Sequence, residues 1–253
     1  PSASYWCGVP GPPQQGDPAL ARVDRERRTN TMRNHTATHL LHAVLQKVVG
    51  PQARQAGSLV APDRLRFDFN TPNPLSKKQL LEIEAGVNQL ILKNYAVHKK
   101  VKPLQQAIDE GATALFGEKY GSTVRTITIG EDQAVSYELC GGTHLDETGD
   151  IGLFVIVYEG SIASGIRRIE AVTGQKAYEH CREQMNTLEK ASGLLSNSPA
   201  EVALKVESLL SELSDSQKEI AVLREKLALE QFQKLLDHAG TCSGVTYLST
   251  LIK

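Results

Sequence analysis

The sequence predicts an α+β fold, with a mostly antiparallel sheet that carries long helices on one face, followed by a long helical hairpin. Two observations predict this class. As far as about residue 174, stretches with helical apolar spacing alternate with short stretches rich in β-branched or alternating residues. Beyond that point the sequence becomes charged and helically periodic. At 253 residues the chain is long enough to bury a substantial core.

The amino-terminal part carries the first strong helix signal. A helix is expected over residues 31–49, and it should end at Gly50-Pro51 because this pair cannot continue a helix. A turn is expected over 55–60. A half-buried strand should follow over 65–69, where apolar and charged residues alternate.

Ser76 should cap the second long helix, because its hydroxyl can accept a hydrogen bond from a free N–H group of the first turn. This helix is expected over 77–95. Short strands and helices come next, and the strand 136–139 should deliver Cys140 at its end. We expect strands over 97–101, 124–129, 136–139, 152–159 and 166–172, and short helices over 104–110 and 112–116.

The carboxy-terminal part should be mainly helical. Helices are expected over 177–195 and 200–237, joined by a turn at Ser198-Pro199. The second helix carries apolar residues near heptad positions, so it should pack against its neighbour across the turn or against a second copy of the chain in a homodimer. Residues 245–252 resemble the first strand of a further domain.

Composition excludes several classes of protein. The 28 basic and 29 acidic residues nearly cancel, so a polyanion would have to be held by a local patch. Aromatic residues make up only 5%, which disfavours a base-stacking single-strand binder. Four separated cysteines indicate a reducing compartment, and neither a membrane-spanning run nor a signal peptide is evident. The chain begins with Pro1, as a fragment of a longer protein would.

Two stretches far apart in the sequence each contain a pair of potential metal ligands four residues apart. His35 and His39 are four residues apart in the first expected helix, so both imidazoles lie on one face. Cys140 and His144 flank two glycines that let the backbone turn. Three imidazoles and one thiolate form a ligand set that suits zinc. Together the two stretches predict a Zn²⁺ site made by His35, His39, Cys140 and His144.

Three alternatives compete with this interpretation. A zinc protease would need glutamate directly after the first histidine, where this chain has Thr36. Cys140 could be a nucleophile with a histidine as base, but a metal would consume the thiolate. Taken one at a time, the histidines could also be core residues and Cys140 a buried thiol.

The motifs around these residues resemble the editing domain of alanyl-tRNA synthetases and of freestanding AlaX proteins, and more distantly that of threonyl-tRNA synthetase. The match extends over residues 23–174, and the helices that follow resemble the dimerising C-terminal region of the synthetases. Its segments are residues 32–41, 57–60, 65–69, 114–121, 138–144, 148–152 and 165–174.

The resemblance implies a hydrolytic domain that cleaves the ester of tRNA(Ala) mischarged with serine or glycine. The family's zinc ligands fall on His35, His39, Cys140 and His144. The family's pocket glutamine falls on Gln55. We count Gln55 and Cys140 as catalytic residues. We expect substrate binding from Gln55, Thr36, Thr38, Arg167 and Arg168.

The individual roles have local alternatives. Thr36 and Thr38 could bond the hydroxyl of serine, or only the carbonyl one helical turn back. Arg167-Arg168 could contact a phosphate of the tRNA acceptor end, or be a solvated strand end with one arginine paired to Glu170. Lysines 99, 100 and 102 could extend a basic strip, or form an ordinary wet face.

The resemblance also predicts the domain organisation and location. Residues 1–22 would be the remnant of a preceding β-barrel or linker, 23–175 the editing domain, 176–238 the helical hairpin, and 239–253 the start of a further C-terminal domain. The adenylate-forming core that binds ATP in the full-length synthetases is absent. We expect a cytoplasmic protein. The alternatives are a non-catalytic, zinc-stabilised module for tRNA binding and dimerisation, or a freestanding editing factor.

Overall fold

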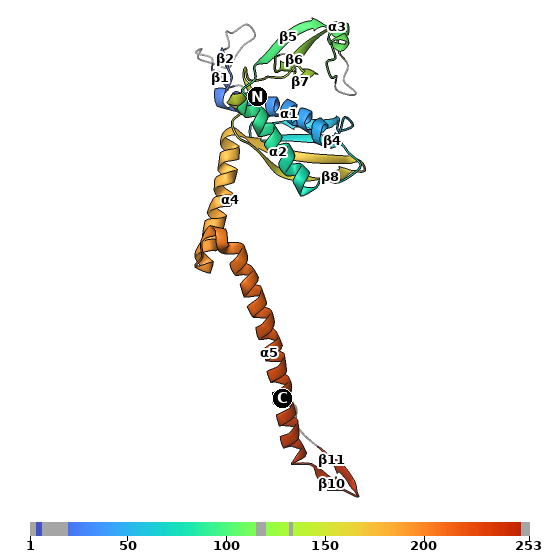
Figure 1. Ribbon diagram of the computed structural model, residues 1–253, viewed down its shortest axis with the longest axis vertical. Coiled ribbons are helices and arrows are strands. Elements are labelled where there is room, and N and C mark those ends of the chain that lie inside the picture. Colours follow the sequence, from blue (N-terminus) through green and yellow to red (C-terminus); the bar gives the residue numbers. More distant parts are fainter. Residues whose placement is uncertain (1–3, 7–19, 115–119, 132–133, 249–253) are drawn as a thin grey trace. The chain divides into compact units, whose positions relative to one another are not determined.

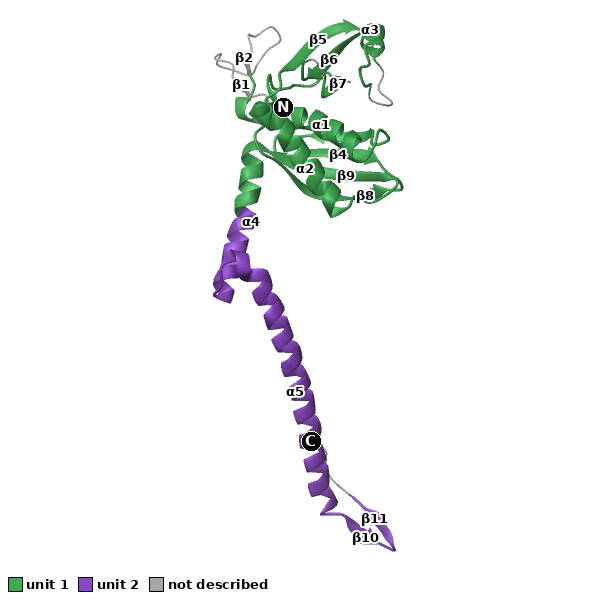
Figure 2. Ribbon diagram, in the orientation of Figure 1, with its two compact units in different colours: residues 1–182 green, residues 183–253 purple. Residues whose placement is uncertain are grey.

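The computed structural model describes residues 4–6, 20–114, 120–131 and 134–248 (Figure 1). The chain divides into two compact units, residues 1–182 and 183–253 (Figure 2). Every pairing between the strands described is antiparallel, so the predicted α+β class is confirmed. Among the described helices, none combines the length and the apolar character needed to cross a membrane.

The first unit contains twelve described helices and strands and the start of a further helix, α4. In chain order they are β1 (Ser4–Trp6), β2 (Leu20–Arg22), α1 (Arg25–Val48), β3 (Gln55–Val60), β4 (Leu65–Asn70), α2 (Lys77–Leu92), β5 (Val97–Pro103), α3 (Leu104–Asp109), β6 (Thr123–Ile129), β7 (Ser136–Leu139), β8 (Phe154–Ala163), β9 (Ile166–Thr173) and the start of α4 (Gly174–Leu195). A 3₁₀ turn, η1, spans Thr148–Ile151.

Several elements differ from the sequence prediction, most of them by a few residues at one end. Helix α1 begins at Arg25, not at residue 31, because the side chain of Asp24 accepts a hydrogen bond from the N–H group of Arg27 and caps it. The predicted turn over 55–60 is wrong, since these residues form β3 and pair with β4. Helix α2 ends at Leu92. The predicted helix over 112–116 is wrong in its described part, since residues 112–114 are not helical and Thr113 forms an isolated β-bridge with Glu138. Residues 115–119, which belong to the family motif, lie outside the described residues.

Apart from the two-stranded sheet of β1 and β2, the described strands of the first unit form two separate sheets rather than one. The first has the order β3-β4-β9-β8 and the second the order β5-β6-β7. Helix α1 packs against β3, β4 and β9 on one side and against β7 on the other, so it lies between the sheets, as Figure 1 shows. The core therefore joins both sheets to α1 and α2.

Burial on two sides places polar residues of α1 inside the protein. Asn34, Thr36, Thr38, His39 and His42 are all buried. Asn34 shows how such groups are satisfied: its amide donates to the carbonyl oxygen of Ala61 at 2.7 Å, and its oxygen accepts from the hydroxyl of Thr173 at 2.7 Å. Buried polar groups without such partners would destabilise the fold.

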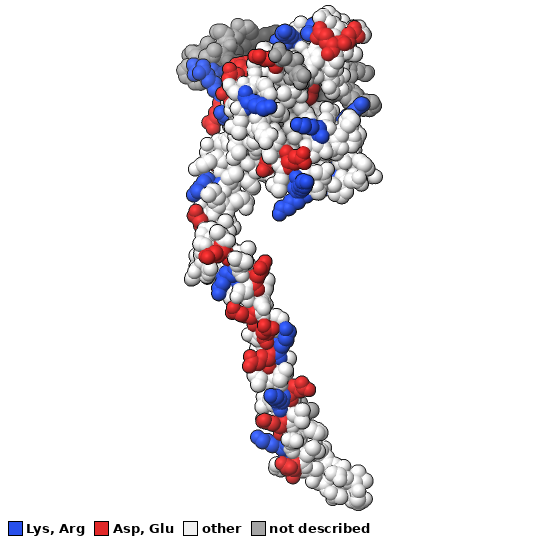
Figure 3. Space-filling model, viewed as in Figure 1, with Lys and Arg blue, Asp and Glu red and all other residues white. Residues whose placement is uncertain are grey.

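The second unit contains the end of α4, a 3₁₀ turn η2 (Pro199–Glu201), helix α5 (Val202–Leu236) and a small hairpin of β10 (Gly240–Cys242) and β11 (Val245–Tyr247). The two predicted helices are thus present, but the predicted packing of the second helix against the first across the turn is not found among the described residues. Helix α5 buries none of its residues, and its charges of both signs are interspersed (Figure 3). Of the predicted strand over 245–252, residues 249–252 lie outside the described part.

Candidate metal centre and adjoining pocket

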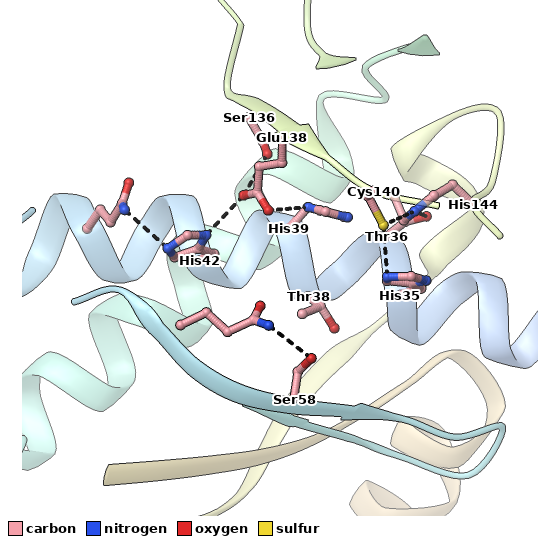
Figure 4. A network of polar contacts seen from close by, with 12 residues as sticks. His35, Thr36, Thr38, His39, His42, Ser58, Ser136, Glu138, Cys140 and His144 are labelled. Carbon is pink, nitrogen blue, oxygen red and sulfur yellow. Dashed lines mark hydrogen bonds and ion pairs between the residues drawn. The ribbon is translucent and has the colours of Figure 1, made fainter. Parts of the chain in front are cut away.

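The two predicted half-sites meet in the folded protein. The ligand atoms of His35, His39, Cys140 and His144 all lie within 4.8 Å of one another (Figure 4). The sulfur of Cys140 is 3.3 Å from Nε2 of His35 and 3.3 Å from Nε2 of His144. Tetrahedral zinc with its usual bond lengths would set such a sulfur–nitrogen separation at about 3.5 Å.

Three elements bring these atoms together. Helix α1 places His35 and His39 one turn apart, with stacked rings whose centroids are 5.5 Å apart. Strand β7 ends at Leu139 and delivers Cys140 to the helix, as predicted. The guanidinium of Arg125 on β6 donates to the carbonyl oxygens of Gly141 at 3.2 Å and Gly142 at 2.7 Å, which holds the turn in place.

Gly142 allows this turn to approach α1. A Cβ atom at this position would lie 2.0 Å from Cε1 and 2.4 Å from Nδ1 of His35. At Gly141, a Cβ atom would meet nothing within 4 Å. Only the second glycine is therefore required by the packing of the metal-ligand rings.

A buried nitrogen atom without a hydrogen-bond partner is evidence that the cluster binds a metal ion. Nε2 of His39 is buried and has no hydrogen-bond partner in the described structure, while its Nδ1 lies 2.8 Å from Oε2 of Glu138. A buried nitrogen left without a partner is costly. A cation among the four donors would satisfy it, so the residues present fit a zinc ion.

The protonation states of two of the four ligands, Cys140 and His144, favour cation binding. Burial opposes ionisation of the Cys140 thiol, but contacts with His144, His35 and His39 lower its pKa to about 3. Burial lowers the pKa of His144 to about 4, so its ring is neutral near pH 7. Burial opposes the protonation of His39, and the Glu138 carboxylate overcomes it and raises the pKa of the ring.

A chain of polar contacts continues from the metal ligands along α1. The second oxygen of Glu138 lies 3.0 Å from Nδ1 of His42 and accepts from the hydroxyl of Ser136 at 3.1 Å. Nε2 of His42 lies 3.1 Å from the side-chain amide of Gln46. One buried carboxylate therefore joins the metal ligand His39 to His42 (Figure 4).

His42 and Gln46 also line a cavity of about 760 Å³. This volume is within the range of small-molecule sites. Gln55 at the start of β3 forms part of the wall, and its amide donates to the hydroxyl of Ser58 at 3.2 Å. The remaining lining residues are Pro51, Arg54, Ala56, Asn70, Thr113 and Ala114.

The two threonines of α1 that were predicted to bind substrate have protein partners. Thr36 is fully buried, its hydroxyl lies 3.4 Å from Nδ1 of His144, and it accepts from the N–H group of Leu145 at 3.2 Å. Thr38 donates to the carbonyl oxygen of Asn34 at 2.8 Å, the local alternative named above. A serine hydroxyl contact by either threonine stays a prediction.

The two arginines of β9 are both ion-paired. Arg168 forms a two-pronged contact with Asp68, at 2.7 and 2.9 Å. Arg167 contacts Glu159 in the same way, with one contact of 2.9 Å. Neither pairs with Glu170, and the phosphate contact stays a prediction.

Two lysines of the predicted basic strip on β5 also form ion pairs with acidic residues. Lys99 pairs with Asp146, and Lys102 pairs with Glu110, which also accepts from the hydroxyl of Tyr137 at 2.7 Å.

The sequence reasoning assigned no role to Glu138, His42, Gln46 or Arg54. His42 follows His39 by three residues, so helical spacing alone could have placed it beside the metal-ligand face. No comparable signal connects Glu138 to both imidazoles. That contact depends on how β7 lies against α1.

Comparison with known proteins first defines a class. Residues 124–170 match the family model described as the threonyl and alanyl tRNA synthetase second additional domain. This segment contains β6, β7, Cys140 and His144 and most of the strands that follow.

Similarity over the whole chain then points to one kind of synthetase within this class. The chain is 48% identical over 94% of its length to an alanine–tRNA ligase of Halorhodospira halophila, and 47% identical over 96% to that of Desulfosudis oleivorans. It spans 27% of the length of each. The predicted resemblance is therefore confirmed: the chain matches one region of alanyl-tRNA synthetases over nearly all of its own length.

The glycine geometry predicts a contrast between two neighbouring substitutions. Gly142→Ala should displace the ring of His35 and weaken zinc binding by about tenfold or more, because a ligand moves away from the other three. Gly141→Ala should bind zinc like the wild type, since its methyl group meets no atom. Titration with zinc in the presence of a competing chelator measures both. Equal affinities for the two variants would contradict the packing argument.

The low pKa of Cys140 predicts how the metal-free protein reacts with iodoacetamide. Cys140 should be alkylated at a rate that changes little between about pH 6 and 8, because its thiolate is already formed, whereas an ordinary thiol gains about tenfold per pH unit. Zinc should suppress the reaction. Peptide mass spectrometry, with the exposed Cys242 as an internal comparison, measures it. A tenfold rise at Cys140 would contradict the assigned ionisation.

Proposed function

We propose that this chain is the editing portion of an alanyl-tRNA synthetase and hydrolyses the ester of tRNA(Ala) carrying serine or glycine. The observation that carries this proposal is the convergence of the four metal donors, which Glu138 and His42 connect to a cavity that contains Gln55. The similarity to alanine–tRNA ligases supports it. We expect the protein to act in the cytoplasm.

The cofactor is proposed to be zinc, held by His35, His39, Cys140 and His144. When bound, zinc supplies a Lewis acid that can polarise an oxygen of the substrate, and it stabilises the fold that holds it. The donor set of one thiolate and three imidazoles is the reason to prefer zinc over magnesium or calcium, which favour oxygen ligands.

The residues of the chain have mainly to bind and orient the substrate. An aminoacyl ester is already activated, so positioning it beside a water molecule accounts for much of the required rate. In our proposal the cavity holds the terminal aminoacylated nucleoside. The amide of Gln55, supported by Ser58, is placed to hydrogen-bond a polar group of the substrate.

Selectivity follows from hydrogen bonding rather than size. A pocket for alanine discriminates poorly against glycine, because one methyl group contributes only about 1–3 kcal/mol. A pocket that must pair with a hydroxyl can separate serine from alanine far better, since an alanyl ester would leave a buried polar group unpaired. Gln55 is the proposed partner of that hydroxyl in the cavity, and Thr36 and Thr38, which do not line the cavity, would have to exchange their present protein partners in order to bind it.

A phosphate of the acceptor end needs a cation near the cavity. Arg54 lines the cavity and is exposed, and within the described residues its guanidinium has no ion-pair partner. Arg167 and Arg168 are held by Glu159 and Asp68, so they would have to exchange a partner in order to bind phosphate. We therefore add Arg54 to the predicted phosphate contacts.

A closed set of four protein ligands is typical of structural zinc, which favours a second candidate function. In that case the domain would be a zinc-stabilised module that binds charged tRNA without cleaving it. The exposed apolar residues of α5 are proposed to pair with a second copy of the chain, which sedimentation velocity would test. Those near heptad positions are Val206, Leu209, Leu213, Ile220, Leu223 and Leu227.

Hydrolysis of seryl-tRNA(Ala) tests the proposed function. The wild-type chain should release serine well above the uncatalysed rate, and Cys140→Ala and Gln55→His should each lower the rate by about tenfold or more, since one removes a metal ligand and the other the pocket amide. Alanyl-tRNA(Ala) serves as the specificity control. Background release by all three proteins, with charged tRNA still bound, would support the non-catalytic module instead.

A further inference from the structure

Glu138 is a buried carboxylate that lies between two buried imidazoles, as Figure 4 shows. Its Oε2 atom is 2.8 Å from Nδ1 of His39, and its Oε1 atom is 3.0 Å from Nδ1 of His42. The side chains of all three residues are at most 8% exposed. The hydroxyl of Ser136, on the same strand, donates to Oε1 at 3.1 Å.

This arrangement fixes which nitrogen of each ring carries a hydrogen. An ionised carboxylate can only accept hydrogen bonds, so Nδ1 of both His39 and His42 must be the donor. In the neutral ring, Nε2 is then left as a lone pair. For His39 that lone pair belongs to the metal-ligand cluster, where the structure gives it no other partner.

For His42, the same argument concerns the cavity. Its ring lines the cavity, and its Nε2 atom can accept the hydrogen bond from the amide of Gln46 at 3.1 Å. Glu138 therefore determines that Nε2 of His42 is an acceptor at the cavity, just as it determines that Nε2 of His39 is free to bind a metal. The two rings extend from the same side of α1, three residues apart.

We propose that Glu138 is a positioning residue that orients the metal ligand His39 with one oxygen and the pocket residue His42 with the other. This inference rests on the metal centre proposed above and extends it. A carboxylate that fixes a metal-bound histidine raises metal affinity by holding the tautomer and the ring orientation. Here the same carboxylate also orders one wall of the substrate pocket.

The isosteric variant Glu138→Gln removes this double role. A glutamine side chain has one accepting oxygen, and its NH₂ group cannot accept from an N–H group. Only one of the two imidazoles can then keep its partner at Nδ1. The other must lose a buried hydrogen bond or change tautomer, which for His39 would place a hydrogen where the metal lone pair is needed.

Zinc affinity, measured by competition with a chelator, tests the inference without relying on activity. Glu138→Gln should bind zinc about 10–100-fold more weakly than the wild type. Ser136→Ala is the matched control. It removes a neutral hydrogen bond to the same carboxylate but keeps both acceptors, so its affinity should stay within about tenfold of the wild type and well above that of Glu138→Gln.

Cobalt-substituted protein provides a spectroscopic readout, because its visible absorption reports the ligands and their geometry. Glu138→Gln should change this spectrum, and Ser136→Ala should not. If Glu138→Gln does not fold, Glu138→Asp replaces it: both acceptors remain on a shorter stem, and an affinity between those of wild type and a metal-ligand variant such as His39→Ala is expected.

His42→Gln separates the two arms of the network. It leaves Glu138 and His39 in place, so zinc affinity should resemble that of Ser136→Ala, while KM for seryl-tRNA(Ala) should rise.

The same zinc affinity in wild type and Glu138→Gln would overturn the positioning role of Glu138 but not the metal centre. Absence of zinc binding by the wild type would instead overturn the metal centre itself. Equal loss of zinc in His42→Gln and Glu138→Gln would indicate general packing damage and also overturn the inference.

Discussion

The burial of α1 between two sheets is the constraint on which the site depends. One side of the helix packs apolar residues such as Leu41 and Leu45 into the core. The residues that remain include imidazoles and an amide, which cannot stay unpaired in a dry interior. Glu138 on β7 and Cys140 in the turn after it supply partners for the imidazoles, and the amide of Asn34 pairs with Ala61 and Thr173. The same packing that stabilises the helix therefore assembles the metal donors.

The sequence predicted the features that local spacing determines. His35 and His39 lie four residues apart in a strongly periodic helix, and Cys140 and His144 flank two glycines, so each half-site could be recognised by itself. The strand 136–139 and the cap at Ser76 also depend on neighbouring residues, and both are present. The chemistry of the ligand set, three imidazoles and one thiolate, then joined the two half-sites across a hundred residues of chain, and the family resemblance implies the same four ligands.

The features that were missed depend on how distant strands are registered. Residues 55–60 contain Gly57 and Ser58, which read as a turn, but pairing with β4 makes them a strand with a bulge near Gln55. The division into two sheets also follows from long-range pairing. Asp68 faces Arg168 only because β4 and β9 pair in one particular register. The double contact of Glu138 is of the same kind.

Metal centre and pocket are adjoining parts of one polar network, and this bears on both proposed functions. A site that is only structural needs the four donors and their support. Here the hydrogen-bonded chain continues beyond this support, from His39 through Glu138 and His42 to Gln46. It ends at a cavity large enough for a small-molecule group. That continuity is the reason we favour a hydrolytic role over a purely structural one.

X-ray absorption at the zinc edge tests the central claim most directly, because it identifies the atoms bound to the metal. The account predicts one zinc per chain, with one sulfur at about 2.3 Å and three nitrogens at about 2.0–2.1 Å, and loss of the sulfur signal in Cys140→Ala. Protein that holds no stoichiometric metal, or zinc surrounded only by oxygen and nitrogen in the wild type, would contradict it.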